Sequence, residues 1–152
     1  MKAPIRLEQA LTKLYEAFHH GTLHPGYCKY CAVGNICDNS DTWIHLTDTH
    51  GSLTLSFIGQ LNENLDRKHF GYLPSELLLI ESTFLKACGY STPLMLGSKK
   101  PTRPQEKELL FEGLCATVGL LCKLDNIPNV MDYSKLFEFE NDAPVHELAD
   151  VF

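Results

Sequence analysis

Three long stretches of this 152-residue chain carry apolar residues at the three- and four-residue spacing of an α-helix, and this periodicity constrains the fold more than any other feature. They cover residues 5 to 18, 74 to 88 and 105 to 124. Their apolar stripes consist of Leu7, Leu11, Leu14 and Phe18; of Leu77, Ile80, Phe84 and Ala87; and of Leu110, Leu114, Val118, Leu121 and Leu124. The third stretch is apolar on almost every side, which indicates a central helix. We therefore expect a mainly α protein, a single-domain helical bundle with irregular loops and at most one short strand or hairpin.

Shorter elements are expected between these helices. Alternating apolar and polar residues over 51 to 59 predict one strand or extended segment. Short helices are expected from residue 32, through Trp43 to Leu46, and around residues 133 to 137. Residues 90 to 104 are rich in Pro, Ser, Gly and Lys and predict a long connection rather than a domain boundary.

The composition, 44% hydrophobic and 21% charged, is that of one globular domain over residues 1 to 152. The formal net charge of -6 is concentrated in residues 132 to 152, where six acidic residues are accompanied by Lys135 alone. We expect this acidic end to fray from about residue 138 to residue 152. A nearly neutral body offers no basic patch to a phosphate backbone, so we expect binding neither to nucleic acid nor to an anionic membrane.

The distribution of apolar residues also bears on location. No apolar stretch of the kind found in secretory signals follows Met1, and the longest apolar-rich run, residues 109 to 122, is interrupted by Glu112. This run is shorter than the ~20 residues that a membrane span needs. We therefore expect no membrane insertion and a cytoplasmic location, in which the six cysteines are reduced thiols or metal ligands rather than disulfides.

The pair Cys28 and Cys31 is the strongest chemical signal. Two cysteines separated by two residues can place both sulfurs on one Zn²⁺ ion, which needs two further ligands. Cys88 and His24 are the best candidates for the third ligand; Cys37, His19 and His20 are the others. The alternative is that no metal binds and that the pair consists of two small, partly buried thiols.

Glu81 is a second position that predicts chemistry. It interrupts an otherwise apolar helix and precedes Cys88 by seven residues on the same face. A carboxylate there must be solvated, paired or bound to a metal, and solvation is the commonest of these outcomes. Cys115 and Cys122, on the most apolar helix, are expected to serve as small hydrophobic residues of the core.

Several other chemistries lack support in the residues. A thioredoxin-like role requires a βαβ unit around the cysteine pair, and an iron-sulfur cluster requires a different cysteine spacing. No glycine-rich dinucleotide, P-loop or nucleophile-elbow motif is present. FAD, NAD and [2Fe-2S] cofactors are therefore disfavoured. A cysteine nucleophile, at Cys31 or Cys88, is an alternative that spacing alone does not decide, although we lean against an enzyme.

Three motifs carry a resemblance that covers nearly the whole chain: Cys28 to Ile36 (CKYCAVGNI), Phe84 to Tyr90 (FLKACGY) and the closing run from Leu121 to Glu140. With these, the chain resembles small bacterial proteins of about 150 residues that are commonly catalogued as the ferredoxin-like subunit of Na⁺-translocating NADH:quinone reductase. That name implies membrane attachment, a [2Fe-2S] ferredoxin domain, FAD and an NADH site. This chain instead has the cysteine spacing C-x2-C-x5-C, the reverse of the C-x5-C-x2-C run in the reductase, and no flavin or nicotinamide motif. No residue role is carried over.

The leading hypothesis is a small cytosolic helical protein with a binding or accessory role and a structural zinc site at Cys28 and Cys31. The alternatives are a redox or electron-transfer component linked to NADH:quinone reductase, as the catalogue name suggests, and an enzyme with a cysteine nucleophile. A homodimer is also expected, because the exposed segment and the surplus of apolar helix surface need a partner. The sequence identifies no protein or small-molecule partner.

Overall fold

The computed structural model describes residues 4–27, 29–40, 42–47, 54–90 and 106–127. These residues form five α-helices and one 3₁₀ helix, and the predicted mainly α fold is confirmed. The elements are α1 (Ile5–His20), α2 (Ala32–Ile36), η1 (Thr42–Leu46), α3 (Phe57–Asn64), α4 (Pro74–Ala87) and α5 (Lys107–Leu124). No strand forms in this part of the chain, where only the isolated bridges Thr47 to Leu55 and His69 to Tyr72 pair extended backbone.

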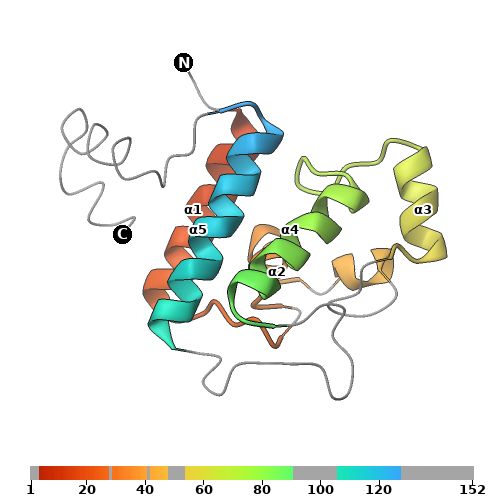
Figure 1. Ribbon diagram of the computed structural model, residues 1–152. Coiled ribbons are helices and arrows are strands. Elements are labelled where there is room, and N and C mark those ends of the chain that lie inside the picture. Colours follow the sequence, from red (N-terminus) through yellow and green to blue (C-terminus); the bar gives the residue numbers. More distant parts are fainter. Residues whose placement is uncertain (1–3, 28, 41, 48–53, 91–105, 128–152) are drawn as a thin grey trace.

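The helices pack in an order that places α4 and α5 at the centre of the contacts. Figure 1 shows α1 and α5 side by side, α4 inclined next to them and α3 at the far edge beyond α4. The short helix α2 contacts both α1 and α4. The core contains the predicted stripes, including Leu7, Leu14, Ile80, Phe84 and Val118, all almost completely buried.

The three long helices lie where the periodicity predicts them. Pro74 occupies the first turn of α4, and Glu76 Oε1 accepts a hydrogen bond from Leu73 N at 2.9 Å, which stabilises that end. The carboxyl end of α5 is tied to the start of α1, because the Arg6 guanidinium donates to Asp125 Oδ1 at 2.6 and 2.9 Å. Phe111 of α5 is 42% exposed, so that helix is less enclosed than its composition indicates.

The closest approach in the fold lies between α4 and α5 at Gly113. A Cβ atom at this position would lie 2.4 Å from Cys88 Sγ and 2.9 Å from Phe84 Cε1. Such distances are shorter than real contacts of this kind, so only glycine lets the two helices pack this tightly.

The strand predicted for residues 51 to 59 is wrong where the structure describes it, because Phe57, Ile58 and Gly59 begin α3. Ser56 causes the difference: its Oγ accepts a hydrogen bond from Gly59 N at 3.1 Å and so caps a helix. Its hydroxyl also donates to His45 O, which joins the cap to η1. Local capping therefore outweighs a short alternating pattern. Residues 51 to 53, the connection from 91 to 104, the helix expected near 133 to 137 and the acidic end lie outside the described residues.

Candidate functional site

Cys31 lies at the amino end of α2. It is completely buried, and its Sγ accepts a hydrogen bond from Gly34 N at 3.3 Å, so the sulfur acts as the N-cap of this helix. The backbone before it is fixed by hydrogen bonds from Cys31 N to Tyr27 O at 2.9 Å and from His24 N to Tyr30 O at 2.7 Å. Cys28, the other member of the pair, lies outside the described residues.

Glu81 of α4 reaches the same helix end. Its side chain is only 2% exposed, and its Oε1 lies 3.3 Å from Val33 N, which donates to it. Solvation, the commonest outcome expected for this residue, does not occur. Val33 and Gly34 are consecutive, so the Cys31 sulfur and the Glu81 carboxylate are brought together at one end of α2 from segments far apart in the sequence. Both are groups that ligate zinc when ionised.

Cys88 follows the last residue of α4 and packs against α5. Its thiol donates to Leu109 O at 3.6 Å, and its sulfur fills the space opposite Gly113. Burial raises the pKa of Cys88 to about 12, and the negative charges of Glu81 and Glu112 contribute to the rise. A thiol with this pKa is protonated at neutral pH, which argues against Cys88 as a nucleophile and for a role in packing.

His24 is partly buried in the loop before the cysteine pair. Its Nδ1 accepts a hydrogen bond from Gly26 N at 2.9 Å, and its ring centroid lies 4.5 Å from that of Tyr27. Burial lowers its pKa, which favours the neutral ring. In a neutral ring with Nδ1 as acceptor, the proton is on Nε2. His24 would therefore have to lose this hydrogen bond or change tautomer before binding a metal.

Among the described residues, no three His, Cys, Asp or Glu side chains form a group that could hold a metal ion. The structure brings Cys31 and Glu81 to one point and directs Cys88 toward α5. The predicted site depends on Cys28, which the described residues do not include, so the zinc site stays a prediction.

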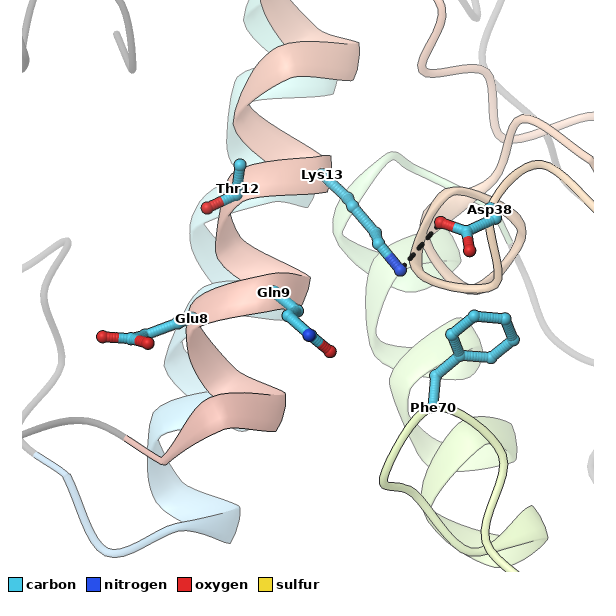
Figure 2. A pocket seen from close by; sticks show the side chains of 6 residues that line it. All are labelled: Glu8, Gln9, Thr12, Lys13, Asp38 and Phe70. Atoms are coloured by element: carbon cyan, nitrogen blue, oxygen red, sulfur yellow. Dashed lines mark ion pairs between the residues drawn. The ribbon is translucent and has the colours of Figure 1, made fainter.

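A second feature, which the sequence did not indicate, is an open groove beside α1. It has a volume of about 500 Å³ and is lined by Glu8, Gln9, Thr12, Lys13, Asp38 and Phe70. Figure 2 shows the Lys13 side chain extending from α1 toward Asp38, with the Phe70 ring below them and Glu8 directed the other way. The groove thus joins one face of α1 to two loops that are distant in the sequence.

Lys13 is the centre of this groove. Its Nζ lies 2.8 Å from Asp38 Oδ1, 2.9 Å from Ile36 O and 4.6 Å from the centroid of the Phe70 ring. Phe70 has a φ of 56° and Asp38 a φ of 60°, a backbone conformation that costs energy for residues other than glycine. No residue lining the groove is a cysteine or a histidine, so the predicted thiol and metal chemistry lies elsewhere. Only Gly71 after Phe70 could have indicated the turn, and no local pattern pairs it with Lys13.

No protein-family model, no curated protein and no solved structure matches this chain significantly. The resemblance to proteins catalogued as a component of NADH:quinone reductase therefore stays a prediction. Within the described residues, none of the helices combines the length and the apolar character needed to cross a membrane.

Proposed function

We propose that this chain is a small helical binding or accessory protein with a structural zinc site, in which Cys28, Cys31 and Glu81 are ligands. The observation that carries the proposal is the convergence of Cys31 Sγ and Glu81 Oε1 on the neighbouring backbone donors of Gly34 and Val33. Thiolate and carboxylate oxygen are both ordinary zinc ligands, at about 2.3 Å and about 2.0–2.2 Å from the metal.

The physical environment supports this ligand set. Cys31 is 0% exposed and Glu81 is 2% exposed, and burying an ionised group is costly unless an opposite charge accompanies it. A divalent cation supplies that charge, and the two backbone donors would orient the ligands from behind, as outer hydrogen bonds do in metal sites. Cys28, two residues before Tyr30 in the sequence, completes the pair.

Cys88 and His24 are weaker candidates for the remaining position. The Cys88 thiol has a partner in Leu109 O, and His24 Nδ1 has one in Gly26 N. Each would have to give up a contact within the folded chain to bind the metal. His24 is the more favourable of the two, because it lies only four residues before Cys28 in the sequence.

Metal analysis of the purified full chain under reducing conditions tests the proposal. We expect about one zinc per chain in the wild type and strong loss of zinc in Cys31→Ser and in Glu81→Gln. Cys31→Ser is well suited to this test, since serine is itself a preferred N-cap and should preserve the start of α2. Cys115→Ser, on a partly exposed residue of α5, is the matched control and should keep its zinc.

Circular dichroism of each variant verifies that the helices persist. Zinc retained by Cys31→Ser, or a wild type that remains without metal after growth with added zinc, would contradict the proposal. Zinc retained by Glu81→Gln alone would remove Glu81 from the ligand set. Iron with visible absorption in place of zinc would favour the electron-transfer hypothesis.

A further inference from the structure

Helix α3 presents its apolar side chains to solvent. Phe57 is 81% exposed, Ile58 52%, Leu61 46% and Leu65 53%, whereas Gly59 is the buried residue of this helix. Residues 57, 61 and 65 follow one another at four-residue spacing, and residue 58 lies three before residue 61, so all four share one side of the helix and its carboxyl end. An amphipathic helix normally turns such a side toward the core. Here it faces outward.

The opposite side of α3 is firmly attached. A Cβ atom on Gly59 would lie 1.9 Å from Leu46 O, so the helix backbone rests directly against η1. At the other end, Glu63 accepts hydrogen bonds from Ser75 N at 2.9 Å and from Ser75 Oγ at 2.8 Å. These contacts fix the orientation of α3 and hold its apolar side away from α4. Figure 1 shows α3 at the edge of the molecule, with α4 between it and the pair formed by α1 and α5.

The charges near this side fit a second copy of the chain. The other exposed side chains of α3 include Gln60 and Asn64, which are uncharged, and Glu63 is engaged by Ser75. Two identical copies can therefore bring these sides together without opposing like charges on α3. A membrane-binding helix would instead need a basic polar face, which α3 lacks.

We propose that α3 forms a two-fold symmetric dimer contact with α3 of a second copy. The helices run antiparallel and cross at Leu61, which places Phe57 against Leu65 of the partner subunit. The row of residues 57, 61 and 65 is a ridge of the kind that packs into the matching groove of an identical helix. A self-complementary patch of this sort is what a two-fold contact requires.

The area agrees with a weak dimer. The four side chains expose on the order of 300–400 Å² of apolar surface per copy. Leu79, one helical turn after Ser75 on α4 and 48% exposed, extends the same surface. A stable interface usually buries about 800 Å² per partner, so we expect dissociation at about micromolar concentration. The dimer is independent of the zinc site, since α2 and α3 have separate faces.

Sedimentation velocity of the full chain over about a hundredfold concentration range tests this contact. We expect a monomer–dimer equilibrium in the wild type and at least a tenfold larger Kd in Leu61→Lys, which places two like charges near the two-fold axis. Gln60→Lys is the matched control: it adds the same charge to the neighbouring position of α3 and should change the Kd less than threefold.

A charge-exchange pair tests the antiparallel register. Phe57→Lys and Leu65→Glu should each weaken the dimer at least tenfold, and the double variant should recover most of that loss because lysine then faces glutamate across the axis. Zinc content should remain at the wild-type value in all variants. A wild type that stays monomeric throughout, or a Leu61→Lys variant with an unchanged Kd, would refute the proposal. Binding of the monomer to neutral lipid vesicles through α3 would also refute it.

Discussion

The contact between α4 and α5 at Gly113 allows a quantitative prediction. In Gly113→Ala, the new methyl group would lie 2.4 Å from Cys88 Sγ and 2.9 Å from Phe84 Cε1, so the helices must separate or the side chains must move. Forcing an extra carbon into a packed core costs about 1–3 kcal/mol. The higher helix propensity of alanine returns about 1 kcal/mol. We expect a net loss of about 1–2 kcal/mol in the free energy of unfolding, or roughly 3–6 °C in Tm.

A double-mutant cycle identifies the cause. Cys88→Ala removes the sulfur that meets the new methyl group, so Gly113→Ala should cost at least about 1 kcal/mol less in that background. Urea denaturation of the four proteins, followed by circular dichroism, gives the coupling energy. A Gly113→Ala variant as stable as the wild type would refute the predicted close packing. Equal costs in the two backgrounds would show that Cys88 is not the residue that Gly113 accommodates.

The remaining predictions concern buried thiols and the turn at Phe70. Burial raises the pKa of Cys37 and Cys88 to about 12 from an ordinary value of 9.0, so their contribution is fully present below about pH 9 and is lost as the pH rises toward about 12, because the unfolded thiols ionise first. Urea unfolding should show a fall of at most about 1.4 kcal/mol per pH unit for each thiol, reduced in Cys37→Ala; an identical slope in that variant would contradict the assignment. Phe70→Asn should raise the free energy of unfolding by about 0.5–1 kcal/mol, because relief of a φ of 56° gains about 1–2 kcal/mol and loss of the Lys13 contact costs about 0.5–1 kcal/mol. A destabilised Phe70→Asn protein in the same assay would mean that the Lys13 contact is the larger effect.

Much of the helical architecture was predictable from local patterns. The stripe from Leu77 to Phe84 and Pro74 at the first turn place α4 almost at its observed bounds, and α1 and α5 follow in the same way. The start of α2 directly after Cys31 was also predictable. The error at residues 51 to 59 has a local cause, since three alternating apolar residues are too few to outweigh the cap that Ser56 provides.

The candidate site was predictable only in part. The sequence identifies Cys31 by its spacing and Glu81 by its position within an apolar helix, but these residues meet only because α2 packs on α4. The sequence also offered Cys88 as a ligand, whereas its sulfur fills the space opposite Gly113. A side chain that can serve either metal binding or packing has no local signal that distinguishes the two.

The sequence by itself determined the helices, because apolar periodicity and capping act within a few residues along the chain. The tertiary structure alone decided which faces of those helices are buried and which remain exposed. Gly59 rests on Leu46 O and so turns Phe57 and Leu65 outward, although their spacing is that of a core-facing stripe. The same holds for Lys13 and Phe70, and for Cys31 and Glu81, since each pair joins segments that are distant in sequence. Periodicity specifies that a helix has an apolar side; only packing between elements specifies what that side meets.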